Sequence, residues 1–187
     1  MKVGVLGTGT MGAGIVQVFA QAGHEVLMRS RHQETLDKAM AMMNKGLSKM
    51  VAKEKITEDT KNEIIGRVKC TTNLADFADC DFIIETIAEN MAVKKDLFAE
   101  LDKLCRPEVI FATNTSSLSI TEIASATTRP QKVCGMHFFN PVPAMKLVEV
   151  IKGQLTDDAT KDYIVNLSKE LKKTPVEVEA APGFVVN

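Results

Sequence analysis

A glycine-rich segment near the amino terminus restricts the possible folds of this chain more than any other feature. Residues 7–12, Gly-Thr-Gly-Thr-Met-Gly, fit the pattern G-x-G-x-x-G between an apolar run, Val3 to Leu6, and a segment with helical spacing, Met11 to Ala22. In that context the glycines permit a tight turn, close approach of a phosphate, and close packing of the helix on the strand. The segment therefore predicts a dinucleotide pyrophosphate site at a helix amino terminus, unless its glycines only close the turn. The predicted contact residues are Gly7, Gly9, Thr10, Met11 and Gly12.

Strand-like and helix-like segments alternate along the rest of the chain. The strand-like runs are Val3 to Leu6, Glu25 to Met28, Val68 to Thr71, Phe82 to Thr86, Val109 to Ala112, Val133 to Met136, Leu147 to Ile151 and Val176 to Val178. The helix-like segments are Met11 to Ala22, His32 to Ala52, Ala92 to Cys105 and Asp157 to Leu171. This alternation predicts an α/β fold of the Rossmann type, with a doubly wound, mainly parallel sheet between helices. Residues 33–66 are too many for a simple crossover and predict a helical hairpin inserted beside the sheet.

Composition excludes several kinds of partner. The 187 residues suffice for one main domain, and 23 basic against 24 acidic residues give a net charge of -1. Such a chain has no strong field to attract nucleic acid or an anionic membrane. The four cysteines are too far apart for a zinc or redox motif, so we expect no metal site. Without a signal peptide or a membrane-spanning stretch, we expect a cytoplasmic protein.

The end of the second strand bears on the choice of dinucleotide. An acid about 20 positions beyond the glycine loop would accept the adenosine ribose hydroxyls of NAD. Here the strand ends Met28-Arg29-Ser30-Arg31, without an acid. We therefore expect NADP, with NAD as the alternative, and contacts from Ser30 and Arg31, whereas strand alternation points Arg29 away. Both arginines also fit solvated surface charges.

A histidine near the end of a predicted strand is a candidate for proton transfer. His137 follows the apolar run Val133 to Met136, and open α/β sheets bind ligands at the carboxyl ends of their strands. Imidazole exchanges protons near neutral pH, and a carboxylate on one ring nitrogen would fix its tautomer. Glu149 lies in the next strand but also fits a solvated acid, and His137 alone also fits a core residue. Spacing does not decide between these interpretations.

Several motifs in this sequence resemble those of the 3-hydroxyacyl-CoA dehydrogenases. They are Asn114-Thr115-Ser116-Ser117-Leu118, then Gly135-Met136-His137-Phe138-Phe139-Asn140-Pro141-Val142-Pro143, and Met145-Lys146-Leu147-Val148-Glu149-Val150. Residues 7–19 resemble the opening of that family, and residues 182–187 resemble its interdomain segment. The resemblance covers nearly the whole chain. It implies that residues 1–187 form the dinucleotide-binding domain, and that a smaller helical domain, through which the family dimerises, is absent from this chain.

The resemblance assigns catalytic roles to four residues. His137 and Glu149 would form a catalytic pair. Ser116 would form a hydrogen bond with the reacting oxygen, and Asn187 would help to hold the substrate carbonyl. Without the resemblance, Ser116 fits a turn or a helix cap before Thr121.

The resemblance also implies contacts with two ligands. Glu89, Lys94 and Asn140 would contact the cofactor ribose or nicotinamide, although Glu89 and Lys94 also fit an exposed pair at a helix start. The predicted hairpin carries lysines that would meet the phosphates of coenzyme A as point charges, or would form a solvated helix face. These lysines are Lys49, Lys53 and Lys55.

The implied activity is reversible oxidation of an L-3-hydroxyacyl-CoA, such as 3-hydroxybutyryl-CoA, with NADP(H) or NAD(H). A dehydrogenase of free 3-hydroxy acids would share the glycine loop but use a lysine base, and the motif around His137 argues against it. A non-catalytic dinucleotide-binding protein is the remaining alternative, against which the intact set of Ser116, His137 and Glu149 argues. We expect the 187-residue chain alone to turn over poorly, because a pocket at a domain interface would lack one wall.

Overall fold

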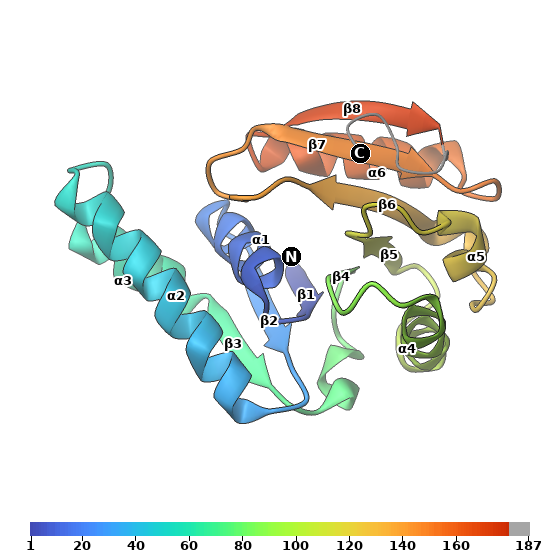
Figure 1. Cartoon of the computed structure of the whole chain (residues 1–187), viewed down its shortest axis with the longest axis horizontal. Coiled ribbons are helices and arrows are strands. Elements are labelled where there is room, and N and C mark those ends of the chain that lie inside the picture. The colour runs from blue at the N-terminus through green and yellow to red at the C-terminus, as the bar shows by residue number, and fades with distance from the viewer. Residues whose placement is uncertain (180–187) are drawn as a thin grey trace.

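The strand-like segments pair into one sheet of eight strands (Figure 1), in a computed structural model that describes residues 1–179. The strands are β1 (Lys2–Leu6), β2 (Glu25–Arg29), β3 (Val68–Thr71), β4 (Phe82–Glu85), β5 (Ile110–Thr113), β6 (Val133–Phe138), β7 (Leu147–Lys152) and β8 (Thr174–Glu179). Their order is β3-β2-β1-β4-β5-β6-β7-β8, and neighbouring strands are parallel except β6 and β7. The order changes direction between β1 and β4, so the predicted Rossmann-type sheet is confirmed.

Helices cover both faces of the sheet. They are α1 (Thr10–Gln21), α2 (Gln33–Ala52), α3 (Glu58–Gly66), α4 (Met91–Leu104), α5 (Ile120–Ala124) and α6 (Asp158–Glu170), with the 3-10 turns η1 (Leu74–Phe77) and η2 (Pro130–Lys132). One apolar core joins α1, α2, α3 and α6 to the sheet, and a second core joins α4, α5 and η1 to its other face. Strands β4 and β6 are buried along their whole length, as expected for strands of a sheet that is covered on both faces.

The predicted helical hairpin consists of α2 and α3. Leu36, Ala39, Met43 and Leu47 are buried at helical spacing, and this face of α2 packs on α1. Figure 1 shows the two helices side by side and extending beyond the β3 edge of the sheet. The hairpin is therefore held mainly by α1, which leaves its outer face to solvent.

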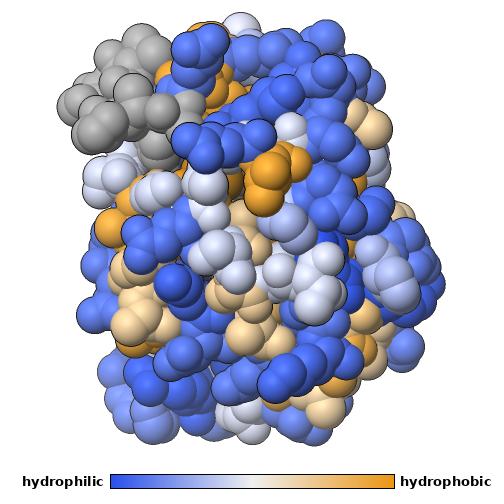
Figure 2. Space-filling view, turned by 90° about the vertical axis from the view of Figure 1, so that its right-hand side faces the viewer, coloured by the Kyte–Doolittle hydropathy of each residue, from blue (hydrophilic) through white to orange (hydrophobic). Residues whose placement is uncertain are grey.

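The remaining differences from the predicted elements are small. Strand and helix ends differ from the predictions by one or two residues, and α5 is an addition because its five residues are too few to show a helical period. Polar residues predominate on the face seen in Figure 2, with apolar residues in small groups between them. No helix within residues 1–179 has the length and hydropathy needed to cross a membrane. All four cysteines are free thiols, and only Cys70 is exposed.

Candidate active site

The glycine-rich segment forms the predicted turn between β1 and α1. Gly7 has a φ of +114°, which favours glycine, and a Cβ on Gly12 would lie only 2.2 Å from the Gly7 carbonyl oxygen. A Cβ on Gly9 would meet no atom within 4 Å. Gly9 is the N-cap of α1 and supplies no side-chain hydrogen bond to the first turn. Open space beside uncapped amides at a helix amino terminus fits the pyrophosphate of a dinucleotide.

The hydroxyl of Thr86 gives a second indication that a ligand fits this loop. Thr86 Oγ1 is buried, lies 2.9 Å from the Cβ position of Gly7, and has no hydrogen-bond partner within residues 1–179. A buried hydroxyl without a partner costs about 1–3 kcal/mol. A polar ligand in the loop would supply the missing partner, so the local residues fit a bound dinucleotide.

A cavity of about 350 Å³ opens at the carboxyl ends of β4, β5 and β6, and we name it the His137 cavity. It brings together predicted site residues from distant parts of the sequence. These are Met11, Glu89, Lys94, Ser116, His137 and Asn140, and the remaining lining residues are Thr86, Ile87, Asn114, Phe138 and Phe139. The cavity lies at the sheet edge where open α/β proteins bind ligands.

Pairing of β6 with β7 places His137 opposite Glu149. The two residues are register partners in this antiparallel pair, and His137 Nδ1 lies 2.7 Å from Glu149 Oε2. The exposed fractions are 6% for His137 and 1% for Glu149, so the interpretation of Glu149 as a solvated acid is wrong. The Phe139 ring lies against the imidazole at 4.6 Å between centroids. A carboxylate at Nδ1 fixes the tautomer and leaves Nε2 as the nitrogen suited to proton exchange.

A buried ion-pair network forms another part of the wall of the His137 cavity. Lys94 is 1% exposed, and its Nζ lies 2.8 Å from both carboxylate oxygens of Glu85 and 3.4 Å from Glu89 Oε2. Thr113 donates a hydrogen bond from its hydroxyl to Glu85. The interpretation of Lys94 as part of an exposed pair is therefore wrong. A buried charge persists only when it is paired, so this network holds Lys94 in a defined place.

The turn after β5 carries Ser116 and fixes the carboxylate of Glu89, the second acid of the network. Thr115 donates its hydroxyl hydrogen to Glu89, and the Ser116 amide donates to the same carboxylate oxygen at 3.2 Å. Asn114 Oδ1 accepts a hydrogen bond of 2.8 Å from the Phe138 amide, which ties the turn to the end of β6. The alternative role of Ser116 as a helix cap is wrong, because Ser119 caps α5.

A second cavity, of about 360 Å³, lies at the end of β2, and we name it the Arg29 cleft. Its lining includes Arg29, Ser30 and Arg31. The expectation that Arg29 points away is wrong: like Leu27 it lies on the α4 face of β2, and its buried Nε has no partner within residues 1–179. The Ser30 hydroxyl lies 2.5 Å from that of Thr35. Two exposed carboxylates of α4, Asp96 and Glu100, line the cleft as well.

The other predicted site residues lie apart from both cavities. Lys49, Lys53 and Lys55 are exposed around the end of α2, and none of them lines the His137 cavity or the Arg29 cleft. Asn187 and the preceding segment from Pro182 lie outside the described residues. The lysines can therefore contact only a ligand that extends out of the His137 cavity.

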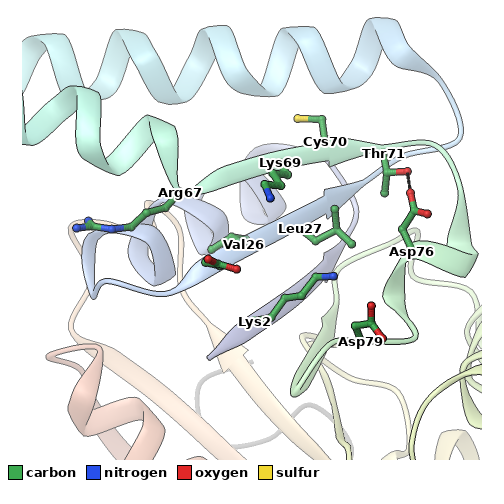
Figure 3. Close-up of a pocket in the computed structure, with 10 residues that line it drawn as sticks. Lys2, Val26, Leu27, Arg67, Lys69, Cys70, Thr71, Asp76 and Asp79 are labelled. Atoms are coloured by element: carbon green, nitrogen blue, oxygen red, sulfur yellow. Dashed lines mark hydrogen bonds between the residues drawn. The ribbon is translucent and has the colours of Figure 1, made fainter.

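A groove of about 400 Å³ along β1, β2 and β3 is separate from both cavities (Figure 3). Its charged residues have both signs: Lys2, Arg67 and Lys69 line it together with Glu25, Asp76 and Asp79. Figure 3 shows Cys70 and Lys69 pointing to opposite sides of β3. The balanced charge and the distance from the glycine loop argue against this groove as the dinucleotide site.

Sequence reasoning missed the residues that support the predicted site. Glu85, Thr113 and Asn114 make the buried contacts described above, and Thr86 faces the glycine loop. One signal was available: Glu85 is an acid at the end of the apolar run Phe82-Ile83-Ile84, and such an acid requires a buried partner.

The fold and the glycine loop together define a dinucleotide-binding α/β domain with a buried histidine–glutamate pair at its ligand-binding edge. The family model described as "3-hydroxyacyl-CoA dehydrogenase, NAD binding domain" matches residues 2–181. The chain therefore belongs to the 3-hydroxyacyl-CoA dehydrogenase family.

Individual relatives agree with this assignment. The chain is 58% identical over 187 residues to a 3-hydroxybutyryl-CoA dehydrogenase of Clostridioides difficile, covering 100% of this chain and 66% of that protein. It is 44% identical to the human mitochondrial hydroxyacyl-coenzyme A dehydrogenase, covering 99% of this chain and 61% of that protein.

Solved structures give the same result. A 3-hydroxybutyryl-CoA dehydrogenase of Escherichia coli K12 superposes with a TM-score of 0.98 at 40% identity, covering 100% of this chain and 39% of that one. The (S)-3-hydroxybutyryl-CoA dehydrogenase of Ralstonia eutropha gives 0.97 at 42% identity, covering 100% and 66%. The chain spans 67% of the length of a probable 3-hydroxybutyryl-CoA dehydrogenase of Deinococcus radiodurans and 39% of that of a 3-hydroxyadipyl-CoA dehydrogenase of Escherichia coli.

Proposed function

We propose that the full-length protein interconverts an L-3-hydroxyacyl-CoA and the corresponding 3-oxoacyl-CoA, with 3-hydroxybutyryl-CoA as the substrate. The observation that carries this proposal is the buried pair of His137 and Glu149, 2.7 Å apart, at the wall of the His137 cavity. The names of the similar dehydrogenases from Clostridioides difficile and Ralstonia eutropha support the choice of substrate.

Oxidation removes a proton from the substrate hydroxyl and a hydride from the carbon atom that bears this hydroxyl. His137 accepts the hydroxyl proton at Nε2 while the carbon–oxygen double bond forms, and Glu149 stabilises the resulting imidazolium through Nδ1. Ser116 donates a hydrogen bond to the reacting oxygen, and Asn187 holds the substrate carbonyl. A bound nicotinamide dinucleotide supplies the hydride acceptor. Reduction of the 3-oxoacyl group runs the same proton transfer in reverse.

The dinucleotide is held by the two cavities and the loop between them. The pyrophosphate would be held at the amino terminus of α1 by the residues of the glycine loop, which are Gly7, Gly9, Thr10, Met11 and Gly12. Glu89, Lys94 and Asn140 contact the nicotinamide and its ribose from the wall of the His137 cavity. The Arg29 cleft receives the adenosine end.

We further propose a preference for NADP(H) over NAD(H). The end of β2 carries Ser30 where an acid would repel a 2′-phosphate, and Arg29 and Arg31 line the same cleft. The unpartnered Nε of Arg29 offers a charge-assisted hydrogen bond to a phosphate oxygen. The carboxylates of Asp96 and Glu100 oppose this preference, and their exposure weakens their effect.

The remaining parts of the proposal concern the rest of the ligand and the assembly. The phosphates of coenzyme A meet the exposed lysines at the end of α2, and a further helical domain closes the substrate pocket and forms a homodimer. The protein acts in the cytoplasm and binds neither nucleic acid nor membranes. The proposed lysine contacts are Lys49, Lys53 and Lys55.

Steady-state turnover of the full-length protein tests the proposed activity. Acetoacetyl-CoA is supplied with NADPH or NADH, and free acetoacetate is the matched control that lacks only the thioester and coenzyme A. We expect oxidation of the reduced cofactor with the thioester, and kcat/KM at least about 100-fold lower with the free acid, because remote binding energy supports catalysis. Equal rates with the free acid would favour a dehydrogenase of free hydroxy acids. Binding of the cofactor without any turnover would favour a non-catalytic protein.

A further inference from the structure

A buried lysine outside the proposed catalytic set is attached to the loop that follows His137. Lys173 is 8% exposed, and its ammonium donates hydrogen bonds to two backbone carbonyl oxygens, those of Val142 at 2.6 Å and Met145 at 2.7 Å. Both acceptors belong to the connection between β6 and β7, which we name the 139–146 loop. The neighbouring Thr174 amide donates to the carbonyl of Lys146 at 2.7 Å and extends the attachment.

The end of α6 directs Lys173 inward. The Lys173 amide donates to the Ser168 carbonyl and the Lys172 amide to the Lys169 carbonyl, which is the Schellman pattern of a helix carboxyl end. Lys172 adopts the left-handed conformation that this pattern requires, with a φ of +59°. The sharp turn leaves Lys172 exposed and turns the next side chain toward the loop. The direction of the Lys173 side chain is therefore set by the backbone.

The 139–146 loop connects this lysine to the candidate active site. At its beginning, Phe139 and Asn140 line the His137 cavity, and Phe139 lies against the imidazole of His137. Further along, Val142 is 2% exposed and packs on α1, where a Cβ on Gly14 would approach its Cβ to 2.8 Å. The loop therefore has a fixed point on α1 and a second fixed point at the Lys173 ammonium.

Burying an ammonium group costs free energy, so its use to hold this loop points to a specific role for Lys173. Burial lowers the pKa of Lys173, because an ammonium loses hydration there. Lys173 also lines a cavity of about 260 Å³ beside the loop, and the other charged residues of that cavity are Lys146, Glu170 and Lys172. Lys173 forms no ion pair with a carboxylate within residues 1–179, so its donors serve the loop carbonyls alone.

We propose that Lys173 is a positioning residue for cofactor binding: it fixes the 139–146 loop so that Phe139 and Asn140 keep their places in the wall of the His137 cavity. The proposal rests on the proposed function of that cavity as the nicotinamide site. His137 itself is held by the β6–β7 ladder and by Glu149, so it keeps its place without Lys173.

Substitution of Lys173 in the full-length protein tests this proposal by direct binding. Lys173→Met keeps the aliphatic stem and removes the donors, and Lys172→Met removes the same charge from the exposed neighbouring position. We expect the Kd of the preferred reduced dinucleotide, measured by its fluorescence, to rise about tenfold in Lys173→Met, as for one lost cofactor contact. The Kd of Lys172→Met stays within about twofold of the unmodified protein, a difference too small to reflect a lost contact. KM for the dinucleotide follows the Kd, while kcat changes less.

The Tm of each variant and the affinity of Lys173→Arg separate an effect on positioning from an effect on folding. The dinucleotide titrations are made at least ~10 °C below the Tm of each variant, so that the folded state is populated. Lys173→Arg restores donors and charge and is expected to recover part of the affinity; if Lys173→Met does not fold, Lys173→Gln takes its place. A lower Tm with an unchanged Kd would overturn the proposal and leave Lys173 a structural residue. Because binding needs no acyl-CoA, failure of the proposed reaction would be seen separately, as binding without turnover.

Discussion

The His137 cavity and the Arg29 cleft have nearly the same volume, about 350 and 360 Å³, but their charges are organised differently. In the His137 cavity each buried charge has a partner in the protein: His137 has Glu149, and Lys94 has Glu85. In the Arg29 cleft, Arg29, Arg31, Asp96 and Glu100 form no ion pairs within residues 1–179.

The difference indicates which end of the site tolerates change. Removing one member of a buried pair leaves an uncompensated charge and disturbs everything bonded to it. The exposed charges of the Arg29 cleft, those of Arg31, Asp96 and Glu100, are screened by solvent, and the loss of one of them changes only the ligand that it touches. Substitutions in the His137 cavity should therefore change the rate strongly, and substitutions in the Arg29 cleft should change cofactor choice moderately.

The largest expected effect is that of His137→Gln in the full-length protein. Glutamine cannot exchange a proton near neutral pH, so kcat should fall at least about 100-fold, the usual contribution of a general base. The Kd of the reduced dinucleotide, titrated by fluorescence, should stay within about twofold, because no phosphate contact is removed. Near-normal turnover would end the assignment of His137 as the base and would break the comparison between the two cavities.

Glu149→Gln should have the next largest effect. The neutral amide keeps the shape but cannot stabilise an imidazolium, so we expect a loss of about 10-fold to 100-fold in kcat, as for one charge-assisted hydrogen bond. Thermal unfolding measured in parallel separates two roles. If the Tm falls while kcat is preserved, Glu149 is a structural residue.

The smallest expected effect is the change of cofactor preference at the Arg29 cleft. Ser30→Asp places a carboxylate beside the 2′-position and should shift the ratio of kcat/KM values from NADPH toward NADH by about tenfold. Arg29→Ala and Arg31→Ala, measured in the same way, show which guanidinium contributes. A wild-type protein that prefers NADH, or a ratio indifferent to Ser30→Asp, would refute the NADP(H) proposal and leave the dehydrogenase proposal standing.

Local patterns in the sequence were sufficient to predict the fold, whereas the residues of the His137 cavity came mainly from the family resemblance. The glycine spacing and the strand–helix alternation depend on short-range chemistry, and the structure confirms both. The family motifs led to His137, Lys94 and Ser116, which the cavity brings together. The pairing of His137 with Glu149 required the register of β6 and β7, which spacing alone left open.

Long-range contacts account for what the sequence did not predict. Glu85 and Thr113 meet only because β4 and β5 are neighbours in register, and nothing in either segment identifies the other. Arg29 was placed on the wrong side because strand alternation gives two faces without saying which one α4 covers. The ammonium of Lys173 reaches a loop about 30 positions earlier, a separation that no local pattern encodes.

The antiparallel pairing of β6 with β7 places His137 and Glu149 in a single β-hairpin. The two residues are equidistant from the turn. The strand register therefore places the acid opposite the histidine, whatever the number of residues in the loop between them. Residues added or lost at the turn itself would preserve this relation, whereas a slip of one residue in either strand would move the carboxylate to the opposite face of the sheet. In evolution or in design, the pair can therefore be inherited or transferred together with the β6–β7 hairpin. The length of the loop can vary for this purpose, but the register of the two strands must be kept.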